Sequence, residues 1–235
     1  YFSTGQWLKE IKKEVTKCDK KNKVPILVGG TGLYFNAVTK GISKIPDIMP
    51  EKRISIRKLH KKIGQEKFYK KLLAIDPTIR NKFSHTDTQR TLRAYEVKKI
   101  TKKSLYEWAR DTKSDFLDYD IKKIFLDVPR EEILKNISKR TKKMFNDKCI
   151  DEVKNFIKLN VEKSLSANKL IGVKEISEYL LGLSTLKQTK ELINVKTRQY
   201  AKRQNTWSRG HMKNWNKLYS KQLPVLVKKI LKAIS

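Results

Sequence analysis

Cysteine is nearly absent from the sequence: the 235 residues contain only Cys18 and Cys149, which lie far apart. Such isolated cysteines exclude a cysteine-rich zinc module within the chain and fit a reducing compartment, so we expect a cytoplasmic protein. No apolar run approaches the roughly 20 residues that a membrane helix needs, and we expect no membrane partner. The phosphate-loop pattern G-x-x-x-x-G-K-[ST] is also missing.

Acidic residues are scarce. The chain has 24 Asp and Glu against 55 Lys and Arg, a formal net charge of +31. A field of this size attracts polyanions and makes their binding salt-dependent, so nucleic acid is the first partner to consider. Compositional bias toward lysine is the alternative, but bias would spread the charge evenly. Clustering of charge on particular helices favours the nucleic-acid interpretation.

Two segments have the composition of buried strands: Val24–Val28 (VPILV) and Ile121–Val128 (IKKIFLDV). Apolar spacing over residues 6–18 predicts an amphipathic helix before the first strand, and the pattern of helix then strand indicates the α/β class. Two parallel strands do not make a viable core, because parallel sheets need several strands with both faces covered. We therefore expect an incomplete sheet whose missing strands lie N-terminal to residue 1.

The organisation predicted from periodicity is an α/β core with an all-helical insertion. Residues 46–119 follow a helical pattern throughout, whereas residues 1–45 and 120–235 contain the predicted strands. The first strand runs directly into Gly29, Gly30 and Gly32. Glycine permits a sharp turn and a close approach of the backbone to a ligand, so this segment is a candidate active-site loop.

A polar segment from Thr86 to Glu96 opens a predicted helix. Gln89, Arg90 and Arg93 fall within its first two turns, at spacings that point them to one side. Such side chains can contact base edges or phosphates. The alternative is a capping box formed by Thr86 and Gln89, in which Gln89 satisfies a backbone donor.

Residues 196–210 predict a helix with almost no aliphatic face, ending at Gly210 as a glycine cap. Such a helix suits the wall of a polar groove, with aromatic side chains available for base stacking. The alternative is a solvated charged helix anchored by Trp207.

Arg140 continues an apolar row formed by Ile133, Ile137 and Met144 on another predicted helix. A guanidinium on such a face requires a buried anionic partner. The alternative is an arginine whose stem packs while its charged end reaches water.

Together these segments resemble the tRNA dimethylallyltransferase (tRNA isopentenyltransferase) family. The matching segments occur in family order and spacing: VPILVGGTGLYFNAV, DTQRTLRAYEV, Arg140–Met144, Ala167 with residues 171–175, and TRQYAKRQNTW.

The resemblance implies transfer of a dimethylallyl group from its diphosphate to the exocyclic amine of the adenosine on the 3′ side of the anticodon. It implies a P-loop-type α/β core with an inserted helical domain, with Mg2+ as cofactor. The implied partners are the anticodon stem-loop of tRNA and dimethylallyl diphosphate, and the complete enzyme is expected to be a monomer.

Site residues follow from the same resemblance. Arg140 matches the arginine that neutralises the departing diphosphate. The positions that match tRNA contacts or the basic helix of the substrate tunnel are Thr31, Arg53, Gln89, Arg90, Thr91, Leu92, Arg93, Arg198, Lys202 and Arg203.

The family's phosphate loop, its magnesium ligand and the aspartate general base have no match in this sequence. No residue here is therefore predicted as the base or as a metal ligand, and we expect the chain alone not to catalyse prenyl transfer. The alternative function is a catalytically inactive, tRNA-binding remnant of a truncated or split gene.

Overall fold

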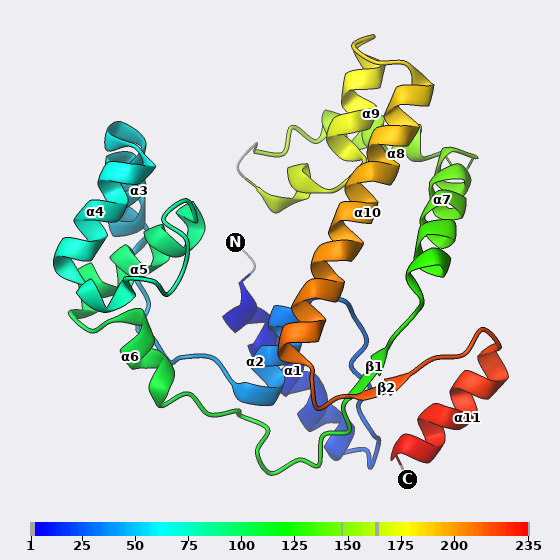
Figure 1. Ribbon diagram of the computed structural model, residues 1–235, viewed down its shortest axis with the longest axis horizontal. Coiled ribbons are helices and arrows are strands. Elements are labelled where there is room, and N and C mark those ends of the chain that lie inside the picture. The colour runs from blue at the N-terminus through cyan, green and yellow to red at the C-terminus, as the bar shows by residue number, and fades with distance from the viewer. Residues whose placement is uncertain (1–2, 147, 163–164, 235) are drawn as a thin grey trace. The chain divides into compact units, whose positions relative to one another are not determined.

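The computed structural model describes residues 3–146, 148–162 and 165–234 and divides into two compact units (Figure 1). Unit 1 comprises Tyr1–Leu33 and Asp120–Ser235, and unit 2 comprises Tyr34–Tyr119. The second boundary lies where periodicity placed it. The first lies before residue 34 rather than after residue 45, because Val38 is buried and its carbonyl accepts a hydrogen bond from the Ser114 hydroxyl of the same unit.

Unit 2 is helical, and the described part of residues 46–119 contains no strand. Its core gathers residues that the periodicity predicted to be buried, because Phe68 and Leu72 are fully buried and Ile56 is buried against them. The elements are α2 (Gly32–Lys40), which begins in unit 1, α3 (Pro50–Ile63), α4 (Gln65–Ile75), the 3-10 turn η1 (Pro77–Ile79), α5 (Thr88–Thr101) and α6 (Leu105–Arg110).

Unit 1 combines helices with a small sheet. The longest described helix, α10, contacts α7, which lies beside the upper part of α10 in Figure 1. The elements are α1 (Thr4–Asp19), β1 (Ile124–Leu126), α7 (Arg130–Asn146), α8 (Cys149–Lys158), the 3-10 turn η2 (Ser166–Lys169), α9 (Val173–Leu180), α10 (Leu186–His211), β2 (Asn216–Leu218) and α11 (Leu223–Ile234).

The sheet consists of β1 and β2 in parallel, with Phe125 opposite Lys217. Strand β1 lies inside the predicted segment 121–128 but is shorter. The sequence analysis missed β2, because Asn216-Lys217-Leu218 has neither β-branched residues nor an apolar run. The parallel direction agrees with the α/β class.

The strand predicted at Val24–Val28 is wrong for this structure. The segment has no regular structure, and Val24, Ile26 and Val28 are 82%, 79% and 91% exposed. A strand is stabilised by hydrogen bonds to a neighbour, and none of the described residues forms a ladder with this segment. The composition correctly indicated an apolar segment, but it does not reveal whether a neighbouring strand is present to pair with it.

The predicted end of the basic helix is also wrong. Helix α10 continues through Gly210 and ends at His211, where the Met212 N–H donates to the Ser208 carbonyl. Gly210 therefore lies inside the helix rather than in the cap.

Helix α11 is short and rich in Leu, Val and Ile. It has 12 residues, and Leu223 and Leu231 are more than half exposed. Among the described helices, none combines the length and apolar character needed to cross a bilayer.

Candidate functional site

The glycine segment of unit 1 lies against the C-terminal half of α10. The Gln204 side-chain amide donates to the Gly30 carbonyl oxygen at 2.9 Å. A Cβ atom added at Gly30 would overlap with Gln204, and one added at Gly32 would overlap with the Trp207 ring. Glycine is thus required here because α10 approaches the backbone closely, which gives the predicted loop a structural reason.

Trp207 anchors this contact. Its ring stacks on His211 with centroids 4.2 Å apart and planes within 3°, and it faces Gly32. The sequence left open whether Trp207 stacks on bases or anchors the helix, and the structure supports the anchor. Gln204 was missed as a contact residue, although it lies one turn before Trp207 within the motif TRQYAKRQNTW.

From Arg198 onward, the basic side chains of α10 are exposed. Arg198 pairs with Glu191 at 2.5 Å, Arg203 lies 5.8 Å from the Tyr200 ring centroid, and Lys202 is exposed. The only described buried residues of α10 are Thr189 and Ile193, so the prediction of a helix without an aliphatic face is confirmed for residues 196–210.

Buried Glu175 joins α9 to α10. Its carboxylate accepts hydrogen bonds from the Gly172 N–H at 2.7 Å and from the Lys196 ammonium. Burial alone raises the pKa of the Glu175 carboxyl, but the bonds from Lys196 and Gly172 outweigh burial, and the pKa lies below its ordinary value. The charged form of Glu175 thereby fixes the start of the basic segment of α10.

Arg140 is exposed on α7, and none of the described residues forms the buried anionic partner that its position suggested. Together with Met144, Cys149 and Glu152 it lines a pocket of about 190 Å³ between α7 and α8. Its exposure fits the interpretation of a packed stem with its charged end in water. No contact of the described residues brings Arg140 to the glycine segment.

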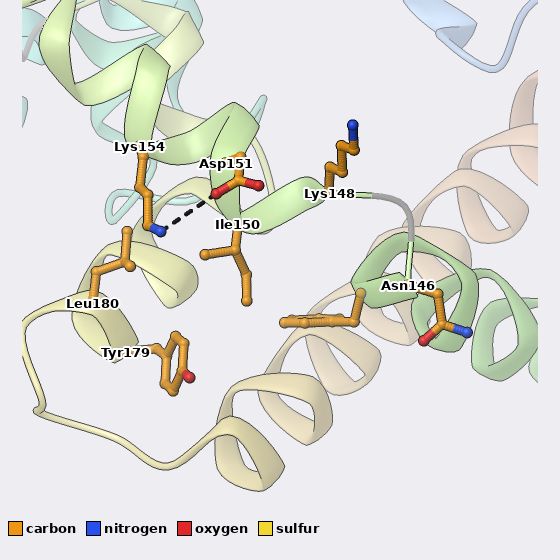
Figure 2. Close-up of a pocket in the computed structure, with 8 residues that line it drawn as sticks. Asn146, Lys148, Ile150, Asp151, Lys154, Tyr179 and Leu180 are labelled. Atoms are coloured by element: carbon orange, nitrogen blue, oxygen red, sulfur yellow. Dashed lines mark hydrogen bonds and ion pairs between the residues drawn. The ribbon is translucent and has the colours of Figure 1, made fainter.

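A second pocket, of about 410 Å³, contains none of the predicted site residues (Figure 2). Ile150 faces Tyr179 and Leu180 there, Lys148 points away, and Asp151 pairs with Lys154 at 3.3 Å. The lining mixes apolar side chains with this ion pair and with the polar Asn146 and Tyr179.

In unit 2, the start of α5 differs from the predicted capping box. Asp87, not Thr86, caps the helix by accepting from the Arg90 N–H at 3.0 Å. Gln89 is therefore released from the capping role, and both Gln89 and Arg90 are exposed. The exposed pair remains available to a ligand.

Two predicted contact residues of α5 support packing instead. Thr91 is fully buried, donating to the Asp87 carbonyl at 2.7 Å and accepting from Gln65 at 3.1 Å. Leu92 packs against the core of unit 2. The Thr91 hydroxyl is thus satisfied inside unit 2, and the place of Thr91 in the predicted tRNA-contacting segment stays a prediction.

Arg53 and Arg93 belong to one cluster with Glu96 in unit 2. Burial lowers the pKa of the Arg93 guanidinium, and the positive charge of Arg53 lowers it further. The remaining predicted position, Thr31, is exposed immediately before α2.

The part of the chain that the structure describes contains no group of three His, Cys, Asp or Glu side chains able to hold a metal ion. Mg2+ usually keeps several waters and is held by one or two carboxylates together with substrate phosphates, so the expected Mg2+ stays a prediction.

The chain is similar to proteins of one known family. The family model described as IPP transferase matches residues 1–211. The tRNA dimethylallyltransferase of Pelagibacter ubique is 49% identical over 232 residues, which cover 99% of this chain and 74% of that protein.

Solved structures agree. A tRNA delta(2)-isopentenylpyrophosphate transferase from Staphylococcus epidermidis is 26% identical with a TM-score of 0.64, covering 100% of this chain and 76% of that chain. A eukaryotic dimethylallyltransferase acting on tRNA has a TM-score of 0.71 at 22% identity, covering 88% of this chain and 52% of that one. The latter likeness concerns the fold alone.

Replacing Gly32 by Ala tests the contact between the glycine segment and α10. The added methyl group must displace Trp207, so we expect a loss of about 1 to 3 kcal/mol in the free energy of unfolding, measured with urea and tryptophan fluorescence. Gly210→Ala is the matched control, because open space surrounds Gly210 and alanine favours a helix interior by about 1 kcal/mol. Equal stability of Gly32→Ala and the parent would contradict the contact.

Glu175→Gln tests the buried carboxylate. A lowered folded pKa means that the charged group stabilises the fold above the unfolded carboxyl pKa of about 4.3, and that this contribution disappears as pH falls through the folded value. We expect Glu175→Gln to lose about 1 to 3 kcal/mol at pH 7 and to depend less on pH below about 4.3 in thermal unfolding. The control Glu178→Gln breaks a surface pair with Lys174 and should match the parent within about 1 kcal/mol. Identical acid profiles of parent and Glu175→Gln would contradict this assignment.

Proposed function

The chain belongs to the IPP transferase family, and from this membership we propose that it serves in the transfer of a dimethylallyl group from its diphosphate to tRNA. The acceptor is the exocyclic amine of the adenosine on the 3′ side of the anticodon. The family match over residues 1–211 is the observation that carries this proposal.

The proposed RNA-binding surface lies on unit 2. Gln89 and Arg90 are exposed after the Asp87 cap, and the Arg93 side chain is 39% exposed one turn further along α5. Guanidinium groups bind phosphate through paired hydrogen bonds, and Gln can pair with adenine. The tRNA dimethylallyltransferase of Pelagibacter ubique, 49% identical to this chain, supports tRNA as the partner.

The proposed chemistry replaces one bond by another. The carbon–oxygen bond of the dimethylallyl diphosphate breaks, the adenosine amine forms a carbon–nitrogen bond, and the amine gives up one proton. Charge gathers on the departing diphosphate, and a preorganised cation stabilises charge that develops in the transition state. We assign this role to Arg140, whose exposed guanidinium on α7 is accessible to an anion.

We also propose that the β1–β2 pair is part of a P-loop-type α/β core in which the segment Val24–Val28 becomes a strand. Its exposed apolar side chains support a pairing position, because an apolar edge readily recruits further strands. No residue of this chain is assigned as the base that accepts the amine proton. We therefore expect the chain alone to bind tRNA without turnover, and a fragment bearing a phosphate loop and an aspartate to restore transfer.

Arg140→Ala in that reconstituted mixture is the test of the proposed chemistry. Loss of one transition-state donor typically slows a reaction by about 100- to 1,000-fold, so we expect kcat to fall by this factor while tRNA affinity changes little. The rate is measured with radiolabelled dimethylallyl diphosphate at saturating donor and tRNA. The neighbouring exposed residue supplies the matched control, Lys139→Ala, which should transfer at the parental rate.

Parental turnover of Arg140→Ala would remove Arg140 from the active site. Absence of transfer in every mixture, with tRNA still bound, would favour the alternative of an inactive tRNA-binding remnant.

A further inference from the structure

Two arginines of unit 2, Arg57 and Arg93, face one buried carboxylate, and Arg53 lies near Arg93. Arg53 and Arg57 lie one turn apart on α3, and Arg93 and Glu96 lie one turn apart on α5, the helix packed against α3. The Glu96 Oε1 atom lies 3.8 Å from Arg57 Nε, and its Oε2 atom lies 4.0 Å from Arg93 Nη1. Glu96 therefore faces guanidinium groups from two different helices.

Burial separates Glu96 from its cationic partners. The Glu96 side chain is 5% exposed, whereas those of Arg57 and Arg93 are 58% and 39% exposed. Each guanidinium thus lies near the carboxylate, on a side chain that remains partly exposed to solvent. A buried carboxylate that faces two flexible cations restricts where their charged ends can lie.

The cluster contains a hydrogen-bond donor that is not used. Arg53 Nε is buried without a hydrogen-bond partner among the described residues, and the acceptor Glu96 Oε1 is likewise buried without one. The nearby carboxylates are those of Glu96 and Asp47, and Asp47 raises the pKa of Arg93. Three guanidinium charges against two carboxylates leave an excess of one positive charge, which equals the charge of one phosphodiester group.

We propose that Glu96 is a positioning residue that aims Arg57 and Arg93 at one phosphodiester group of bound RNA. The inference deepens the proposed function and rests on it, since it assumes that unit 2 binds RNA. Glu96 acts only through the arginines and does not contact the RNA itself. Arg57, which the sequence analysis did not single out, becomes a direct phosphate contact.

The variant Glu96→Gln distinguishes a positioning role from a simple effect of net charge, because the two predict opposite changes in RNA affinity. Removing a negative charge raises the net charge of the chain from +31 to +32, which by itself strengthens the binding of a polyanion. If Glu96 positions the arginines, affinity for an anticodon stem-loop RNA should instead fall by about tenfold. Binding is measured by fluorescence anisotropy with the full chain over a series of salt concentrations.

Glu66→Gln is the matched control for charge. Glu66 lies in the same unit, its side chain is 76% exposed, and it pairs only with Lys70 at 2.8 Å among the contacts described. This variant makes the same charge change without touching the cluster, so it should bind RNA as tightly as the parent or slightly more tightly.

Arg57→Lys keeps the inference testable if Glu96→Gln does not fold. Arg57 is mostly exposed, so the variant should fold, and it keeps the charge while losing the planar fork that binds phosphate in two places. We expect affinity to fall by about fivefold or more. The exposed Arg110 gives the control, Arg110→Lys, which should match the parent.

The outcomes are distinct. Weaker binding by Glu96→Gln and Arg57→Lys, with both controls unchanged, supports the inference. Parental binding by Arg57→Lys, or a folded Glu96→Gln variant that binds as tightly as Glu66→Gln, overturns it while leaving RNA binding intact. Absence of binding by the parent overturns the proposed function, and the inference with it.

Discussion

Two buried glutamates, one in each unit, hold basic side chains in place in a chain where cations greatly outnumber anions. Glu175 binds Lys196 and the start of α9, and Glu96 faces Arg57 and Arg93 across α3 and α5. A carboxylate removed from water must meet cations or hydrogen-bond donors, so each buried glutamate fixes the surrounding basic groups. The net charge of +31 gives the molecule a general attraction for polyanions, and these two carboxylates give parts of that charge a defined geometry.

Arginine and lysine have different roles in the proposed binding of RNA. Arg57 lies on α3, and Arg90 and Arg93 lie in the first turns of α5, with further arginines on α6, α7 and α10, whereas exposed lysines occur on almost every described helix. Lysine supplies a diffuse field, and the planar guanidinium provides directed, paired hydrogen bonds. Affinity for RNA can therefore come from the whole surface, while orientation of the RNA depends on a few arginines.

The sequence predicted the helices, the extent of the helical insertion at its C-terminal end and the apolar character of Val24–Val28, because periodicity and composition are local properties. Strand pairing is not local: β2 has no strand signature, and Val24–Val28 has one without a partner among the described residues. The Gly29, Gly30 and Gly32 segment was identified from its glycines alone, but the reason for them, the close approach of Gln204 and Trp207, required the structure.

For the site residues too, the sequence predicted local features, and contacts between distant residues required the structure. The spacing of Gln89, Arg90 and Arg93 placed them together, yet only the Asp87 cap showed that Gln89 is free of the capping role. Thr91 lies within the same motif and is buried, because a motif marks a segment without distinguishing its inner and outer faces. Burial of Glu96 amid polar neighbours had no sequence signal, since a glutamate in the middle of a helix is normally exposed.

The central claim is that RNA is bound at defined arginine-bearing surfaces rather than by lysine charge in general. Ultraviolet cross-linking of the chain to an anticodon stem-loop, with the cross-linked peptides identified by mass spectrometry, tests it most directly. We expect cross-links to concentrate in residues 50–57, 88–93 and 196–209, and to persist at a salt concentration that removes weak contacts. Cross-links spread over α1, α7 and α11 in proportion to their exposed lysines would contradict the account.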